Sequence, residues 1–322
     1  MVKSLEIGLG SITLDELQRL VGTSDENLKV LEQHFKCSIS VRGDSFIVSD
    51  CNSQLAFTQI QVILNALLVL LRNNYEIKPK TVEQAITLAE LGEIDLIEDL
   101  HTTIIGKTLH NKKIFPKTLG QLWYAKALFN FDIVFAIGPA GTGKTYLAVA
   151  YAVEQYRLGA VKKIILTRPA VEAGESLGFL PGDLKEKADP YLRPLYDALD
   201  EMLGHEAVER MMEKGIIEIA PLAYMRGRTL ENCFVILDEG QNTTSSQLKM
   251  FLTRLGNSSK MIITGDITQI DLPKYATSGL VEAEEILGGI KSIAFVKLGS
   301  NDVARHPLVQ DIIDAYGKLD IK

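Results

Sequence analysis

Short apolar runs separated by helix-like stretches dominate the chain from about residue 115 onward. They cover residues 133–137, 163–167, 216–219, 234–237, 261–264 and 293–296. Most are rich in β-branched residues and lack strict alternation with polar positions, which is typical of strands buried on both faces. Strands that take turns with helices in this way predict an α/β domain with a mostly parallel sheet.

The first 75 residues follow a different pattern. A stretch with helical spacing comes first, two alternating segments around a turn come next, and a long apolar helix follows. These predicted elements cover residues 25–35, 37–48 and about 53–71. Helix, hairpin and helix together predict a small α+β module at residues 1–75.

Residues 76–114 are predicted to be a connector between this module and the larger domain. Residues 81–91 have the spacing of one amphipathic helix. The acidic stretch at 90–99 is interpreted as a solvated face. The larger domain is therefore expected to cover residues 115–322.

The composition is that of a folded, soluble protein. The 322 residues are 46% hydrophobic and 23% charged, and the formal net charge is −7. No apolar run reaches the about 18 residues expected of a membrane span, and the first residues lack the apolar core of a signal peptide. These features predict a cytoplasmic protein with no membrane partner.

Net charge leaves nucleic acid open as a partner, and the spacing of the cysteines argues against disulfides and zinc. The acidic net charge offers no bulk attraction for nucleic acid, although a local basic groove remains compatible with it. Cys37, Cys51 and Cys233 are widely spaced and form no C-x-x-C pair. Neither a disulfide framework nor a zinc site is expected from this spacing.

The most specific signal is a glycine-rich segment directly after the run at 133–137. It fits the pattern G-x-x-x-x-G-K-[ST] and leads into a stretch of helix formers. Loop amides and a helix N-terminus at such a place bind phosphate oxygens. Lys144 is expected to bridge the β- and γ-phosphates of ATP, and Thr145 to hold Mg²⁺. The predicted nucleotide-binding residues of this loop are Gly138, Pro139, Ala140, Gly141, Thr142, Gly143, Lys144 and Thr145.

Polar side chains beyond the loop complete a nucleotide site. The run at 234–237 ends in Asp238 and Glu239, the form in which one carboxylate holds Mg²⁺ and its neighbour polarises the attacking water. Gln269 follows the run at 261–264, where it is placed to sense the γ-phosphate. Gln121, on a predicted helix at 118–129, is a candidate for reading the edge of adenine.

Together these motifs resemble the ATPase half of UvrD-type helicases. Longer strings are similar to the bacterial PhoH-like family, and these lie at residues 168–182, 225–230, 264–273 and 302–309. The resemblance covers residues 115–322 and implies a single RecA-like P-loop NTPase domain in which Gln241 also serves the nucleotide site. The N-terminal module resembles the KH-like module of the longer PhoH-like proteins.

The chain departs from the family pattern in two places. Gly240 stands where the family usually has alanine, which leaves Asp238, Glu239 and Gln241 in place. The N-terminal module has Gly-Thr-Ser-Asp at 22–25, without the second glycine of the G-x-x-G loop with which KH domains clamp a nucleic-acid backbone. RNA binding and a docking or assembly role both remain open for this module.

One RecA-like domain leaves a bound γ-phosphate open on one side, whereas a UvrD-type helicase covers it with a second domain. An arginine from a neighbouring subunit is a common way to meet the transition-state charge. The chain is therefore expected to form a homo-oligomer, with a ring as the favoured form. The candidate arginines are Arg168, Arg226, Arg228, Arg254 and Arg305, of which Arg305 is preferred and Arg228 is second.

The leading hypothesis is a Mg²⁺-dependent ATPase with Lys144, Glu239, Gln269 and Arg305 as catalytic residues. RNA as a partner, and a helicase-like or remodelling role in RNA processing, are implied by the resemblance alone. The alternative is a nucleotide-controlled binding protein, in which ATP occupancy sets assembly and turnover is incidental. A small-molecule P-loop kinase is a third reading that leaves Gln121 and Gln269 without a role.

Overall fold

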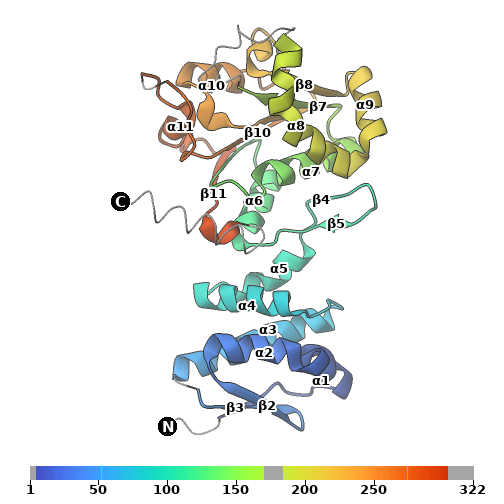
Figure 1. The fold of residues 1–322 in the computed structure, drawn as a ribbon, viewed down its shortest axis with the longest axis vertical. Coiled ribbons are helices and arrows are strands. Elements are labelled where there is room, and N and C mark those ends of the chain that lie inside the picture. Colours follow the sequence, from blue (N-terminus) through green and yellow to red (C-terminus); the bar gives the residue numbers. More distant parts are fainter. Residues whose placement is uncertain (1–4, 52, 170–183, 274, 304–322) are drawn as a thin grey trace. The chain divides into compact units, whose positions relative to one another are not determined.

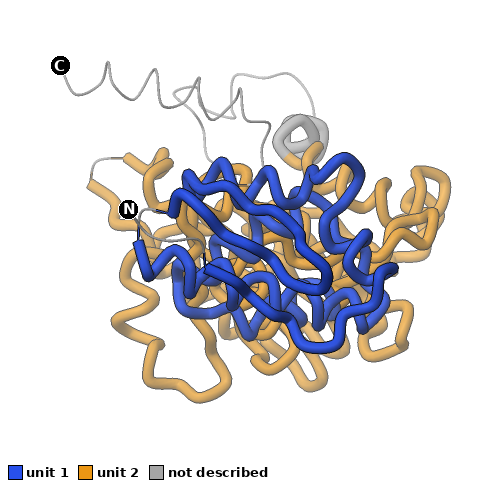
Figure 2. The backbone as a smooth tube through the Cα atoms, turned by 90° about the horizontal axis from the view of Figure 1, so that it is seen from below, with its two compact units in different colours: residues 1–102 blue, residues 103–322 orange. Residues whose placement is uncertain are grey.

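Residues 5–51, 53–169, 184–273 and 275–303 are described by a computed structural model of the protein. The chain divides into two units, residues 1–102 and 103–322, which are drawn in different colours in Figure 2. Each unit has a sheet of its own.

Unit 1 contains the elements predicted for the N-terminal module and adds others around them. In chain order its elements are β1 (Leu5–Gly8), α1 (Leu14–Val21), α2 (Glu26–Phe35), β2 (Ser38–Arg42), β3 (Ser45–Ser49), α3 (Gln54–Arg72), α4 (Pro79–Leu91) and α5 (Ile97–Thr102). The predicted helix, hairpin and long helix correspond to α2, β2–β3 and α3 and are confirmed. The central strand β3 pairs antiparallel with both β1 and β2.

The first strand and helix of unit 1 were not predicted, although α1 carries a readable start signal. The hydroxyl of Thr13 accepts a hydrogen bond from the Glu16 amide, and the Glu16 carboxylate accepts one from the Thr13 amide. This capping box satisfies two backbone donors that a helix start would otherwise leave unpaired. The Thr-x-x-Glu spacing therefore marks the start of α1.

Helix α3 fills the interior of unit 1. By length and composition it is a helix that is able to cross a membrane, which departs from the expectation that no segment would meet those criteria. It buries Ile60, Ile63, Leu67 and Leu71 and contacts α1, α4 and α5. Because 39% of its most apolar window is buried, this core accounts for only part of the apolar content of the helix.

The structure divides the chain at residue 102, so the expected connector at 76–114 is shared between the two units. Helix α4 packs on α2 and α3 through its buried apolar face, which includes Val82 and Ile86, and α5 buries Ile97 and Leu100. The strands β4 (Gly106–Lys107) and β5 (Lys113–Ile114) belong to unit 2, where they pair with each other and contact α7. The acidic stretch is therefore largely a solvated face that contains one buried apolar residue, Ile97.

Unit 2 is built on a six-stranded parallel sheet within the described residues, in the order β11-β6-β10-β9-β7-β8. Its strands are β6 (Ile133–Ile137), β7 (Lys163–Arg168), β8 (Ile217–Pro221), β9 (Cys233–Leu237), β10 (Lys260–Gly265) and β11 (Ile293–Lys297). Its longer helices are α6 (Leu119–Asn130), α7 (Lys144–Arg157), α8 (Leu184–Leu203), α9 (His205–Glu213), α10 (Ser245–Leu252) and α11 (Gly279–Leu287). Each predicted strand is confirmed, and the α/β class with a parallel sheet is correct.

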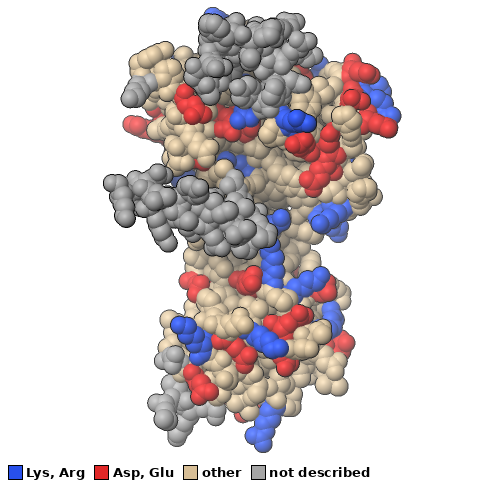
Figure 3. Space-filling view, viewed as in Figure 1, with Lys and Arg blue, Asp and Glu red and all other residues tan. Residues whose placement is uncertain are grey.

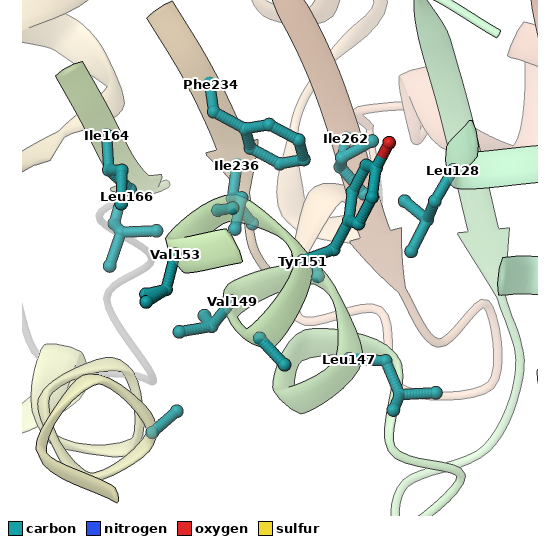
Figure 4. Close-up of a cluster of buried hydrophobic side chains, with 14 of the residues drawn as sticks. Leu128, Leu147, Val149, Tyr151, Val153, Ile164, Leu166, Phe234, Ile236 and Ile262 are labelled. Carbon is teal, nitrogen blue, oxygen red and sulfur yellow. The ribbon is translucent and has the colours of Figure 1, made fainter. Parts of the chain in front are cut away.

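Helices cover both faces of this sheet (Figure 1). On one face, α7 packs Val149 and Val153 against strand residues such as Ile164, Phe234 and Ile236 (Figure 4). On the other face, α10 and α11 pack their own set against the alternate strand residues; this set is Leu248, Phe251, Leu280 and Ala283. Burial on both faces is why these strands read as unbroken apolar runs.

Candidate active site

The loop at 138–143 has the backbone that its glycines predict. Gly141 and Gly143 have φ values of +86° and +79°, a region that other residues adopt only at a cost. A Cβ on Gly138 would lie 2.4 Å from the Leu298 carbonyl oxygen, so this position also requires glycine. Helix α7 begins at Lys144, directly after the loop, and its free amides point toward the loop. The chain thus forms a phosphate cradle between β6 and α7.

The Lys144 ammonium lies inside the curve of this loop. Its Nζ donates hydrogen bonds to the carbonyl oxygens of Gly138 and Pro139, at 2.6 and 2.9 Å. The residue is only 9% exposed, so these contacts hold a positive charge at the position where the β- and γ-phosphates are expected.

Three oxygen atoms converge next to the cradle, at the carboxyl ends of β9 and β10. The Asp238 Oδ1 atom accepts hydrogen bonds from the Thr145 hydroxyl at 2.7 Å and from the Thr264 hydroxyl at 2.6 Å. The sequence predicts two of these residues as Mg²⁺ ligands, and the structure brings them together. Carboxylate and hydroxyl oxygens are ligands that suit Mg²⁺, so the residues present fit this metal.

Glu239 follows Asp238 with a backbone that is rare for its residue type. Its φ is +55°, and strained conformations of this kind at non-glycine residues cost about 1–3 kcal/mol and gather at functional sites. Its Oε1 atom lies 3.1 Å from Arg168 Nη2, and its Oε2 atom accepts a hydrogen bond from Gln241 Nε2. The carboxylate is therefore held on both oxygens at the edge of the site.

Gln241 connects this carboxylate to the strand next to it. The Gln241 side chain is fully buried, and its Oε1 atom accepts a hydrogen bond from the Asp266 amide at 3.0 Å. Its Nε2 atom also donates to the Gln269 carbonyl oxygen at 3.1 Å. Gln269 in turn donates from Nε2 to Asp266 at 3.0 Å. The side-chain amide of Gln241 thus positions both Glu239 and the segment from Asp266 to Gln269. The sequence pattern alone does not indicate this role.

Gln121 forms hydrogen bonds within the chain through both atoms of its side-chain amide. It is 3% exposed; its Oε1 atom accepts a hydrogen bond from the Lys117 amide, and its Nε2 atom donates to the Thr142 carbonyl oxygen at 3.0 Å. The side chain therefore fastens the start of α6 to the phosphate loop. Contact with adenine stays a prediction, and it would require the amide to change partners.

Lys144, Thr145, Asp238, Glu239 and Gln269 line one pocket of about 480 Å³. Most of the charged side chains in its described lining are acidic: Asp197, Glu201, Asp238, Glu239 and Asp266. The cations that line it are Lys144 and Arg168. Beside the pocket, burial and the hydrogen bond from its hydroxyl to Glu201 raise the pKa of Tyr146, so this phenol stays a donor that links α7 to α8.

The family model described as PhoH-like protein matches residues 113–317, more than half of the chain. A PhoH-like protein of Bacillus subtilis (strain 168) is 56% identical over 304 residues, which cover 94% of this chain and 95% of that protein. The chain belongs to the PhoH-like family.

Other members agree with this assignment. A PhoH-like protein of Mycobacterium bovis is 49% identical over 302 residues, covering 94% of this chain and 85% of its own length. Protein PhoH of Escherichia coli (strain K12) is 42% identical over 250 residues, covering 77% and 69%. Among solved structures, a Sulfolobus solfataricus SWI2/SNF2 ATPase core in complex with dsDNA covers 57% of this chain and 46% of its own, with a TM-score of 0.34 and 14% identity. A likeness at that level supports no conclusion.

The candidate arginines of this PhoH-like protein occupy very different places. Arg228 forms a two-pronged ion pair with Glu218, at 2.6 and 2.7 Å, and Arg254 donates to the carbonyl oxygens of Met250 and Arg228. Arg226 is exposed on the loop after β8. Arg305 lies outside the described residues. Arg168 alone among the described candidates lines the pocket.

Arg228, the second choice for the arginine finger, is paired with Glu218 of its own subunit, and its role as a finger stays a prediction. Its hydrogen bonds hold the pKa of Glu218 below the ordinary value, as expected for a carboxylate fixed by a guanidinium. The pairing crosses from the loop after β8 back to β8 itself, a contact that residue spacing does not reveal.

Proposed function

We propose that this PhoH-like protein binds ATP with Mg²⁺ at the phosphate cradle of unit 2 and hydrolyses it. The observation that carries the proposal is the convergence of Thr145, Asp238 and Thr264 beside the cradle, with Glu239 one residue further on in the same pocket. An oxygen cluster for the metal, a cation for the phosphates and a carboxylate for water are the groups that phosphoryl transfer needs.

Each residue has a definite task in this proposal. Bound Mg²⁺ would neutralise charge on the phosphate oxygens and orient them. Lys144 would donate to β- and γ-phosphate oxygens, and Glu239 would accept the proton of the attacking water. The water oxygen bonds to the γ-phosphorus as the bond from that phosphorus to the β–γ bridging oxygen breaks, and ADP leaves. Gln269, positioned through Asp266, would contact the γ-phosphate side.

A turnover assay tests the proposal. The purified protein should release phosphate from ATP in the presence of Mg²⁺, and a chelator of divalent cations should abolish the release. Lys144→Ala should lose turnover and bind ATP more weakly, because the positive charge in the cradle is gone. Lys249→Ala, which removes an exposed lysine of α10, is the matched control. Turnover by Lys144→Ala at the wild-type rate would place the site elsewhere.

We also propose that hydrolysis is coupled to RNA and occurs in the cytoplasm. The support is family resemblance rather than charge: on the face drawn in Figure 3, acidic and basic side chains of the described residues are interspersed. Stimulation of the ATPase rate by single-stranded RNA would support a remodelling enzyme. A slow rate that RNA leaves unchanged would favour the alternative, an ATP-controlled assembly switch.

Unit 1 is proposed to be a KH-like module. The order β1-α1-α2-β2-β3-α3 around an antiparallel sheet supports this, as does the loop at 22–25 between α1 and α2. Gly22 and Asp25 have positive φ values of +82° and +61°. Asp25, which stands where the G-x-x-G loop has its second glycine, therefore keeps a backbone conformation suited to glycine. The carboxylate of Asp25 would repel the nucleic-acid phosphates that such a loop clamps. A docking or assembly role for the module is therefore the favoured one.

A further inference from the structure

We propose that Arg168 is an arginine that serves the γ-phosphate within its own subunit. In this inference the guanidinium exchanges Glu239 for the γ-phosphate of ATP, and the exchange frees the carboxylate to act on water. The inference rests on the proposed ATPase function and adds a catalytic residue to it.

The sheet places Arg168 next to Glu239 by its register. Strand β7 pairs with β9 through Thr167 and Leu237, and the Asp238 amide donates to the Thr167 carbonyl oxygen at 2.9 Å. Arg168 and Glu239 therefore leave adjacent parallel strands, each one residue beyond this last contact. Their proximity follows from the backbone of the sheet rather than from two flexible side chains meeting by chance.

The contact between the two side chains lies within the candidate site. Arg168 Nη2 is 3.1 Å from Glu239 Oε1, and the two side chains are 23% and 32% exposed, so both reach the pocket. With Gln241 on the other oxygen, the carboxylate already holds two donors. A carboxylate in that arrangement is a weaker acceptor for a water proton than one held by the Gln241 amide alone.

The charges around the pocket indicate which partner Arg168 would take. Five carboxylates line the described pocket against two cations, and Lys144 is held within the loop by two carbonyl oxygens. A γ-phosphate brings more negative charge than the Glu239 carboxylate, and its oxygens match the fork of a guanidinium. The phosphate would therefore compete effectively for Arg168.

Glu239 keeps its place when Arg168 leaves. Gln241 is fully buried and fixed by the Asp266 amide and the Gln269 carbonyl oxygen, so its hydrogen bond to Glu239 does not depend on the guanidinium. The exchange thus does two things at once: it brings a cation to the phosphate and leaves an oriented carboxylate facing water. Hydrolysis is tied in this way to the presence of the γ-phosphate.

The first test separates catalysis from folding and from general nucleotide affinity. Arg168→Ala should lower kcat by roughly 10³- to 10⁵-fold, the range for the loss of an arginine that stabilises transition-state charge. Affinity for a non-hydrolysable ATP analogue should fall by roughly 10-fold, the value of about one charge-assisted contact, while ADP affinity and Tm stay near those of the wild type. Arg168→Lys should recover part of kcat. Arg210→Ala, on the exposed side of α9, is the control.

The second test asks whether the arginine acts in its own subunit. Arg168→Ala protein is mixed with an excess of Lys144→Ala protein, which carries an intact Arg168 but cannot turn over. No recovery of activity is expected. Recovery would show that Arg168 acts on a neighbouring site and would overturn the proposal.

Two other results would also overturn it. Wild-type kcat in Arg168→Ala would show that the residue has no part in hydrolysis, and equal losses of ADP and ATP-analogue affinity would show a structural role. If Arg168→Ala does not fold, Arg168→Gln and Arg168→Lys are compared in the same way. Failure of the ATPase proposal itself is distinguishable, because in that case the wild-type protein would not hydrolyse ATP.

Discussion

At the scale of single residues, Glu239 is the group whose chemistry is most specific. Glu239→Gln keeps the shape of the side chain and its place beside Gln241 but removes the acceptor of the water proton. ATP should still bind, and hydrolysis should fall by roughly 10²-fold or more, as is typical when a general base is lost. Single-turnover kinetics together with equilibrium ATP binding measure the two effects.

A neighbouring substitution provides the contrast for that experiment. Asp238→Asn should raise the Mg²⁺ concentration needed for half-maximal rate, because Asp238 belongs to the oxygen cluster with Thr145 and Thr264. Normal hydrolysis by Glu239→Gln would make that carboxylate a structural residue. The two substitutions are thus distinguished because Glu239→Gln lowers the rate of hydrolysis and Asp238→Asn raises the Mg²⁺ requirement.

The packing around Gly240 accounts for glycine in place of the alanine of the family pattern. Its φ does not require glycine, but a Cβ at this position would lie 2.6 Å from Ile263 Cγ2 in the neighbouring strand. Gly240→Ala should therefore lower the free energy of unfolding by about 1–3 kcal/mol, the usual cost of overpacking. In an Ile263→Ala background, which removes the methyl group, the same change should cost less. Urea unfolding of the four proteins measures this coupling, and equal costs in both backgrounds would contradict it.

At the scale of elements, an ion pair joins the start of α1 to the end of α3. Arg72 Nε donates to Glu16 Oε1 at 2.8 Å, and this hydrogen bond is the main cause that lowers the pKa of Glu16 from 4.5 to about 2. A depressed carboxyl pKa stabilises the fold above the unfolded-state value, and the stabilisation is lost as pH falls toward the folded-state value. The contribution of the pair should therefore be complete above about pH 4.5 and vanish toward about pH 2.

Unfolding of Glu16→Gln compared with the wild type tests this pH dependence. The wild type should be the more stable protein at pH 7, and the difference should shrink steadily between pH 4.5 and pH 2. Asp15→Asn, on the same turn of α1, is the matched control. Asp15 is 77% exposed, and its ion pair with Arg19 is longer, at 3.6 Å. A difference that is constant over this pH range would mean that the charge of the Glu16 carboxylate does not contribute to stability.

Prediction from sequence succeeded for elements whose residue pattern alone identifies them. The strands of unit 2 are β-branched runs buried on both faces, and Thr145 meets Asp238 because parallel strands present their carboxyl ends at one edge. The extent of the connector stays a prediction, because the apolar positions of α4 indicate that this helix packs but do not indicate its packing partner. The partners of Arg228, Gln121 and Arg168 depend on contacts between distant residues, which no local pattern records.

At the scale of the whole molecule, the described part of unit 2 supplies one parallel sheet and one phosphate cradle. The groups placed around that cradle follow β6, β7, β9 and β10 of a single domain, and residues of α8 complete the described lining of the pocket. We propose that another copy of the same chain completes this site. Head-to-tail contacts between identical subunits close into rings.

A subunit-mixing experiment tests completion by a neighbour, with Arg305 as the arginine supplied. Arg305→Ala protein, with its cradle intact, should be inactive alone and regain part of its ATPase activity when mixed with Lys144→Ala protein, which still supplies Arg305. Arg168→Ala in the same mixture should regain none, because its arginine is proposed to act within one subunit. Sedimentation with ATP present should show an oligomer. A fully active monomer with no recovery in either mixture would mean that one chain completes its own site, and that Arg168 supplies the arginine the site needs.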